Sequence, residues 1–165
     1  MGKFWFRQLS VEEDGDFLPR MFDILYTNMM AISPSDAGYE TDRNLWLSYM
    51  VPALRDGETK VVLMLSGEEL AGYVQYSFRG ETVLVEEMEI RPDYQRGMLF
   101  YRCGQYLLAH MPENIRYMES YVNKQNKNSL SIQKKLGMEI IGENRSGRSW
   151  HMQGNVDIIA KRFAR

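Results

Sequence analysis

Apolar residues in the first third of the chain recur at the spacing of an α-helix. One such stripe consists of Phe17, Leu18, Met21, Phe22, Leu25 and Met29. Positions three and four residues apart share one helix face, so we predict a helix that is capped within Asp14-Gly15-Asp16 and runs to about Asn28. A second stripe predicts a helix over 41–54, which Pro52 should kink or break. A short strand over 3–9 precedes both helices.

From Lys60 onward the hydrophobic period changes to that of strands. Three runs follow one another, separated by short turns that contain Gly: Val61–Leu65, Leu70–Phe78 and Thr82–Ile90. This spacing predicts a three-stranded antiparallel meander. A helical stripe over Leu99–Met111 then ends at Pro112. The remaining predicted elements are a strand over Tyr117–Val122, a helix over Lys127–Leu136, a strand over Met138–Ile141 and a strand within Ser149–Ile159.

The order of these elements is strand, two helices, three strands, helix, strand, helix and two strands. Such an alternation predicts the α/β (α+β) class. A chain of 165 residues has the usual size of one domain. With 44% hydrophobic and 25% charged residues, the composition is typical of a soluble globular protein. We therefore expect a single domain over residues 1–165.

Charge and cysteine content exclude several classes of function. The net charge of −2 argues against a dedicated nucleic-acid binder, which needs a basic face for phosphate. The apolar runs are far shorter than a membrane span, so no membrane association is expected. Cys103 is the only cysteine, which excludes an internal disulfide and a cysteine-based zinc site, and neither histidine has a partner arrangement that suggests a metal. The N-terminus lacks the build of a signal peptide, so we expect a cytoplasmic protein.

Two segments have the residues of a ligand site. The first is the predicted strand–turn–helix over 90–108, because a helix N-terminus presents unpaired backbone N–H groups that favour phosphate. Three arginines lie around that turn: Arg91, Arg96 and Arg102. The second is the helix that follows Asn126 and ends before Gly137, two residues that helix capping alone explains. A plain connection with solvated arginines is the simplest reading of the first segment on its own.

Taken together and in this order, the two segments resemble the motifs of the GNAT superfamily of N-acetyltransferases. The first motif is matched in its first part by Ile90-Arg91-Pro92-Asp93-Tyr94-Gln95-Arg96. The second is matched in register by Asn126, Ser129, Lys135 and Gly137, with Met138 in place of an aromatic residue. The resemblance implies a GNAT-like domain with a mixed, mostly antiparallel sheet of about seven strands flanked by about four helices. Its parts are an N-terminal strand with acceptor-side helices (1–57), a central meander with the coenzyme A loop and helix (60–111), and C-terminal strands with a helix (117–165).

The resemblance also implies a reaction and its site. Members of the superfamily transfer an acyl group from coenzyme A to an amine, so acetyl-CoA is the expected co-substrate and a small-molecule or peptide amine the expected acceptor. Glu87 and Glu89 share one face of the predicted strand and are the candidates for the general base. Tyr121 is the candidate acid. The expected coenzyme A contacts are Ile90, Gln95, Arg96, Gly97, Met98, Leu99, Asn126 and Ser129.

The sequence departs from the family pattern at two points. Met98 and Phe100 stand where relatives have small residues that let the backbone approach the pyrophosphate. Gln133 stands where relatives often have the tyrosine that protonates the leaving thiolate. We therefore predict weak or altered coenzyme A binding. The alternative function is an inactive structural or interaction module, as in the internal virion proteins of short-tailed phages, which would place it in a virion. A homodimer or larger assembly is a further expectation, since relatives often pair.

Overall fold

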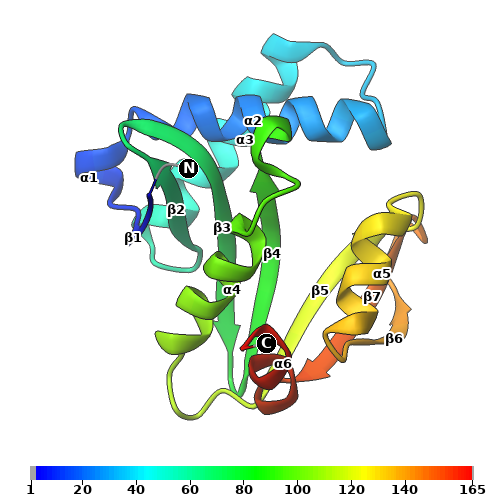
Figure 1. Ribbon diagram of the computed structural model, residues 1–165. Helices are drawn as coiled ribbons and strands as arrows, with labels where there is room; N and C mark the ends of the chain where they lie inside the picture. The colour runs from blue at the N-terminus through cyan, green and yellow to red at the C-terminus, as the bar shows by residue number, and fades with distance from the viewer. Residues whose placement is uncertain (1–2, 165) are drawn as a thin grey trace. The chain divides into compact units, whose positions relative to one another are not determined.

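The computed structural model describes residues 3–164, which form an α/β fold with a seven-stranded sheet (Figure 1). The strands are β1 (Phe4–Gln8), β2 (Lys60–Ser66), β3 (Glu69–Arg79), β4 (Thr82–Ile90), β5 (Tyr117–Asn123), β6 (Glu139–Glu143) and β7 (Ser149–Asn155). The helices are α1 (Val11–Asp14), α2 (Phe17–Ile32), α3 (Tyr39–Arg55), α4 (Leu99–Ala109), α5 (Lys127–Lys135) and α6 (Val156–Phe163), with a 3-10 turn η1 (Pro92–Tyr94). The fold class and the seven strands are confirmed, whereas the expected number of helices was too low.

The strands are ordered β1-β2-β3-β4-β5-β7-β6 across the sheet. Strand β2 runs antiparallel to β1 and to β3, and β7 runs antiparallel to β5 and to β6. Only two residues separate β3 from β4, a link that antiparallel neighbours use. Residues 82–85 of β4 run parallel to 117–120 of β5. The sheet is therefore mixed and mostly antiparallel, as expected.

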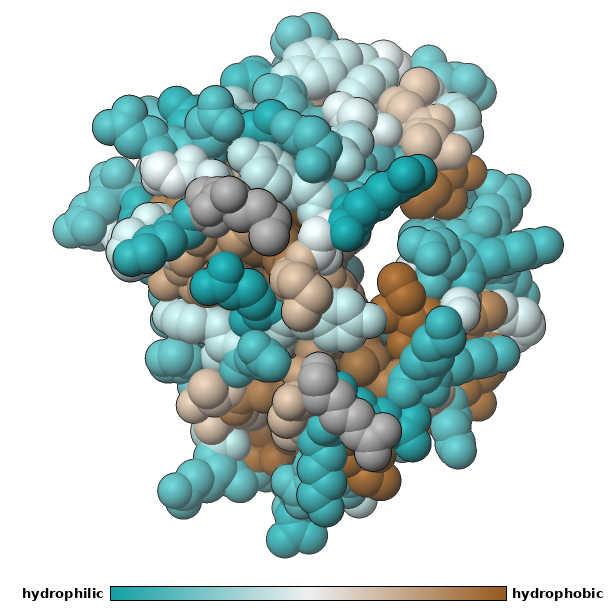
Figure 2. Space-filling model, in the orientation of Figure 1, coloured by the Kyte–Doolittle hydropathy of each residue, from teal (hydrophilic) through white to brown (hydrophobic). Residues whose placement is uncertain are grey.

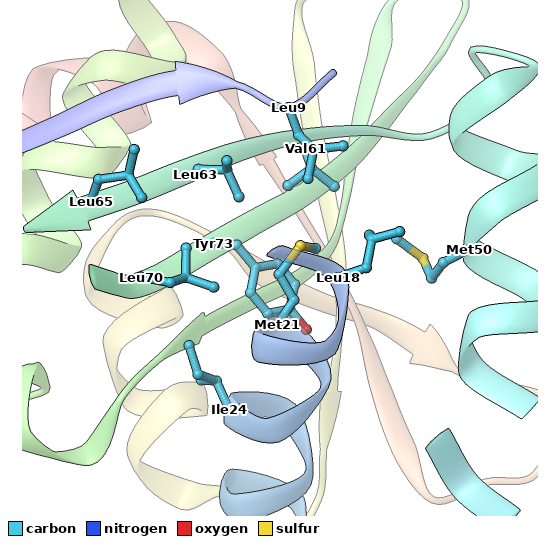
Figure 3. Close-up of a cluster of buried hydrophobic side chains, with 10 residues drawn as sticks. All are labelled: Leu9, Leu18, Met21, Ile24, Met50, Val61, Leu63, Leu65, Leu70 and Tyr73. Carbon is cyan, nitrogen blue, oxygen red and sulfur yellow. The ribbon is translucent and has the colours of Figure 1, made fainter. Parts of the chain in front are cut away.

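The chain packs as two compact units. Within the described residues, unit 1 comprises 3–76 and 87–100, and unit 2 comprises 77–86 and 101–164. Each unit has its own buried apolar side chains. In unit 1 helices α2 and α3 pack on β2 and β3 through a cluster of ten residues (Figure 3): Leu9, Leu18, Met21, Ile24, Met50, Val61, Leu63, Leu65, Leu70 and Tyr73. Exposed apolar side chains include Trp5 and Leu45, and the face shown in Figure 2 is mostly hydrophilic.

The start of the chain differs from its predicted form. Asp14 does not cap the long helix; it ends the short helix α1, where its buried carboxylate accepts two 2.7 Å hydrogen bonds from Arg7. Helix α2 begins at Phe17 and continues to Ile32, four residues beyond the expected end. Pro52 lies in the last turn of α3 and does not break it. The hydrophobic pattern predicted the buried side of α2, where Leu18, Met21 and Phe22 lie, but not the ends of the helices.

The end of the chain holds a helix that the sequence analysis missed. The predicted strand within Ser149–Ile159 ends at Asn155, whose side chain accepts hydrogen bonds from the backbone N–H groups of Asp157 and Ile158. This is a helix N-cap, and the apolar residues Val156, Ile159 and Phe163 recur behind it at helical spacing. An Asn cap before such a stripe was therefore the overlooked signal for α6.

Candidate functional site

The turn between β4 and α4 is built from local contacts in unit 1. Strand β4 ends at Ile90, η1 follows, and residues 95–98 lead into α4, which begins at Leu99. This confirms the prediction that the turn lies at a helix N-terminus after a strand. The Arg91 guanidinium pairs with Asp93 at 2.7 Å and lies over the Tyr94 ring at 5.3 Å. Arg91 therefore stabilises the turn itself.

Gln95 joins this turn to the end of β4 and to α2 by hydrogen bonds. Its side-chain amide donates to the carbonyl oxygen of Ile90 at 2.9 Å and to Oδ1 of Asn28 at 3.2 Å. Two of the predicted coenzyme A contacts, Ile90 and Gln95, are thus bonded to each other. Arg96 and Gly97 follow on the exposed side of the turn.

The three large residues after Gly97 have separate environments. Leu99 is buried, with 1% of its surface exposed, whereas Met98 is 60% exposed and Phe100 is half-buried. Leu99 is therefore part of the core, whereas the Met98 side chain faces solvent. A leucine at this position therefore points its side chain away from the surface of the turn.

The two candidate bases form a carboxyl pair in unit 1. The Asn28 side-chain amide donates to Oε2 of Glu89 at 2.8 Å and to the Ile90 carbonyl at 3.0 Å. Burial raises the pKa of Glu89, and hydrogen bonds from Asn28 and Glu87 partly oppose that rise. A carboxyl group whose pKa is raised toward neutrality is better matched to proton abstraction than an exposed one.

Two further polar residues lie on β3 of the same unit. Tyr73 is fully buried, and burial together with the charges of Glu87 and Glu89 raises its pKa well above the usual value. Gln75, two residues later, is also buried. The sequence analysis missed both, and also Asn28; the signal for the first two was a polar atom on each of two side chains that alternate along a largely apolar part of β3.

The second predicted motif is located in unit 2. Oδ1 of Asn126 accepts from the backbone N–H of Ser129 at 3.1 Å, which caps α5 as predicted. Gly137 adopts φ +98° after the helix, a conformation that other residues rarely take. Gln133 accepts a short hydrogen bond from the Ser120 hydroxyl and donates to Ser129 Oγ at 3.2 Å. Gln133 is thus a neutral side chain held by two serines.

Tyr121 lies with a His–Glu pair on the β5 and β7 strands of unit 2. It is 47% exposed, and its ring stacks on His151 at 4.5 Å. Nε2 of His151 pairs with Oε1 of Glu119 through a short hydrogen bond, and Gln153 donates to the other oxygen of Glu119 at 3.4 Å. Of these residues the sequence analysis named Tyr121 as a candidate. Glu119 could not be found from the sequence, because only the register of β5 against β7 brings the three side chains together.

The described chain holds neither a metal-binding cluster nor a membrane-spanning helix. Within residues 3–164 no three His, Cys, Asp or Glu side chains converge as a metal site. None of the helices in this range combines the length and apolar character needed to cross a membrane. Cys103 is buried, which raises the pKa of its thiol to about 12.

Comparison with known proteins identifies the fold. No protein-family model and no curated protein sequence matches this chain. Among solved structures, an acetyltransferase from Thermus thermophilus is 16% identical with a TM-score of 0.75, and the match covers 94% of this chain and 99% of that one. The PaiA N-acetyltransferase of Thermoplasma acidophilum, in complex with coenzyme A, is 14% identical with a TM-score of 0.67, covering 93% and 99%.

A third similar structure is a spermidine N-acetyltransferase from Vibrio cholerae in complex with coenzyme A and spermine. It is 15% identical with a TM-score of 0.66, and the match covers 94% of this chain and 97% of that one. Likenesses at this level of identity establish the fold. The chain therefore has the fold of the GNAT acetyltransferases, which confirms at the level of fold the resemblance found in its motifs.

Proposed function

We propose that this protein is an N-acyltransferase that transfers an acetyl or related acyl group from coenzyme A to an amine. The observation that carries the proposal is the Glu87–Glu89 carboxyl pair near the end of β4, held by Asn28 within a GNAT fold. An amine attacks a carbonyl only when its nitrogen is unprotonated, so a base beside the acceptor is the main chemical requirement. Burial equips Glu89 for that role because it raises the pKa of its carboxyl group.

The proposed reaction is a direct transfer. Acyl-CoA supplies an activated thioester carbonyl. Glu89, directly or through a water, takes the proton that the acceptor nitrogen loses as its C–N bond forms. The C–S bond breaks, and the sulfur receives a proton, so the products are an amide and free coenzyme A. We assign that final proton to Tyr121, because the side-chain amide of Gln133 is not an acid.

We propose that the coenzyme A pyrophosphate binds at the turn between β4 and α4. The N-terminus of α4 offers backbone N–H groups, and Arg96 and Gly97 lie on its exposed side. Burial of the Leu99 side chain keeps it clear of those groups, whereas the exposed Met98 narrows access to them. We therefore propose binding weaker than in relatives that have small residues at this turn. Asn126 and Ser129 remain the proposed contacts of the pantetheine arm.

We propose a small cationic amine as acceptor and the cytoplasm as the compartment. The carboxylates of Glu87 and Glu89 favour a cation over an anion at this place. The spermine bound to the similar Vibrio cholerae enzyme supports the same class of ligand. We also propose that the chain acts as one domain and pairs with a second copy.

A second candidate function is an inactive module with the same fold. Two observations favour it: Met98 is exposed at the phosphate turn, and Gln133 is bonded to Ser120 and Ser129 where an acid is needed. This candidate requires that the protein neither binds acetyl-CoA nor turns it over.

One experiment separates the two candidates. Acetyl-CoA is titrated into the protein by calorimetry, and free thiol release is then followed with a panel of primary amines that includes spermine. We expect measurable binding and acceptor-dependent thiol release, which Glu89→Gln abolishes and the exposed control Glu68→Gln leaves unchanged. Absence of binding at millimolar acetyl-CoA by a folded sample would establish the inactive module instead.

A further inference from the structure

The hydroxyl group of Tyr73 is buried without a protein partner. The residue lies in the middle of β3, and its ring packs among the apolar side chains of unit 1 beside Met21 of α2 (Figure 3). No group within residues 3–164 makes a hydrogen bond with its oxygen. Buried hydroxyl groups in native proteins are almost always paired with protein or with an ordered water. A partner from outside the protein is therefore required here.

A second unpaired oxygen lies on the same face of the same strand. Gln75 is 4% exposed, and its Oε1 also lacks a hydrogen-bond partner in the described part of the chain. Tyr73 and Gln75 are two positions apart, so their side chains leave β3 on one side. Their neighbours across β2 are Leu63 and Val61, which offer no polar group. A buried donor and a buried acceptor thus share one face of β3, and their neighbours on β2 are apolar.

The carboxyl pair of β4 lies beside this part of β3. The Arg91 N–H donates to the Ala71 carbonyl at 2.9 Å, and a Cβ atom on Gly72 would overlap with the Glu89 carbonyl oxygen. Glu87 and Glu89 are also the two titratable groups whose charges raise the pKa of Tyr73, in addition to burial. From α2, Asn28 reaches Glu89 with an uncharged amide, and Glu87 is the titratable group that bonds to Glu89. A phenol that lies near carboxylates without bonding to them directly has the arrangement of a water-bridged contact.

We propose that Tyr73 is a positioning residue whose hydroxyl, together with Oε1 of Gln75, holds one buried water against the Glu87–Glu89 carboxyl pair. The hydrogen bonds balance: Tyr73 donates to the water oxygen, and the water donates one proton to Gln75 and the other to a carboxylate. Such a water stabilises the ionised form of the pair, and so keeps a proton acceptor available despite burial. A role of this water in catalysis rests on the proposed acyltransferase function, whereas the presence of the water does not.

The test is a titration that needs neither acceptor nor coenzyme A. The side-chain carboxyl carbons of Glu87 and Glu89 are followed by NMR as a function of pH in the wild type, in Tyr73→Phe and in Gln75→Met. Loss of the water's hydrogen bond should move the titration of the pair upward by about half a pH unit or more in both variants. Tyr76→Phe, on the opposite face of β3, is the control and should leave the titration unchanged.

The outcomes separate this inference from the proposed function. An unchanged titration in folded Tyr73→Phe and Gln75→Met overturns the inference, whether or not the protein is an enzyme. A shifted titration supports it even in a protein that shows no thiol release. Where thiol release is measurable, the acidic limb of the pH–rate profile of Tyr73→Phe should move upward by the same amount, and a limb that stays in place would contradict the positioning role.

Discussion

The side-chain amide of Asn28 lies 2.8 Å from Oε2 of Glu89 and spans 61 positions of the sequence to reach it. The same amide donates to the carbonyl of Ile90 at 3.0 Å, and the Gln95 side chain donates to Oδ1 of Asn28 at 3.2 Å. Helix α2, the end of β4 and the turn before α4 are thereby joined through one side chain. The proposed base and the proposed phosphate turn therefore have a common support within unit 1.

Replacement of Asn28 by alanine should affect both stability and the base. The Glu89 carboxyl and the Ile90 carbonyl would each lose a donor, so we expect the free energy of unfolding to fall by about 1–3 kcal/mol in urea titrations. The Asn28 hydrogen bond lowers the pKa of Glu89, so its loss should raise that pKa and shift the acidic limb of thiol release to higher pH. Asn44→Ala, at an exposed position of α3, is the control, and equal losses in the two variants would refute this role.

Glu89→Gln should lower the rate of thiol release and raise the free energy of unfolding at neutral pH. Folding raises the pKa of Glu89 above its usual value of 4.5, chiefly by burial, so the folded protein binds this proton more tightly than the unfolded chain. The resulting stabilisation is present in full below pH 4.5 and is lost as the pH rises through the pKa of the folded state. A neutral Gln avoids that loss. We expect a higher free energy of unfolding than wild type at pH 7, a flatter dependence on pH above 4.5, and thiol release at least about a hundredfold slower. A variant less stable than wild type at pH 7 would contradict this reasoning.

Asp14→Asn should destabilise unit 1 in the opposite pH range. Hydrogen bonding to Arg7 is the main cause that lowers the pKa of Asp14, and burial opposes it. The stability from the carboxylate is therefore present above its usual value of 3.8 and is lost as pH falls through the lower folded value. We expect a loss of about 1.5–3 kcal/mol at pH 7 that shrinks in acid, measured by chemical denaturation. Glu12→Gln, exposed on the same helix, should show no such loss.

Met98→Gly should tighten acetyl-CoA binding. The exposed Met98 side chain lies at the turn where relatives have small residues, and its removal opens the backbone to the pyrophosphate. We expect at least a tenfold lower Kd by calorimetry, about 1.4 kcal/mol. Met98→Leu keeps the bulk and should bind like wild type. If the two variants bind alike, access at the turn does not limit affinity.

Features set by short stretches of sequence were predictable. The α4 turn after Ile90, the Asn126 cap and the left-handed Gly137 each depend on a few consecutive residues, and all three were found where they were expected. The helix over 156–163 could have been found in the same way, because its Asn cap and apolar stripe are equally local.

Pairings across the fold were not predictable. Asn28 meets Glu89 only because α2 packs on the sheet, and a polar residue on an amphipathic helix gives no hint of its partner. Glu119 meets His151 only through the register of β5 against β7. A shift of one residue in that register would place the two side chains on opposite faces of the sheet. The candidate bases could be named from alternation along one strand, but the side chains that tune them could not.

The ring of Phe163 packs over Gly104 of α4, where a Cβ atom would overlap with it, and this contact has a consequence for synthesis. A ribosome delivers the chain from its N-terminus at about 5–20 residues per second. Helix α4 therefore emerges well before β5, α5, β6 and β7, and the surface of Gly104 that Phe163 covers stays open until residue 163 follows them. During that interval a chaperone has access to α4 around Gly104, and a stalled nascent chain would keep that surface exposed.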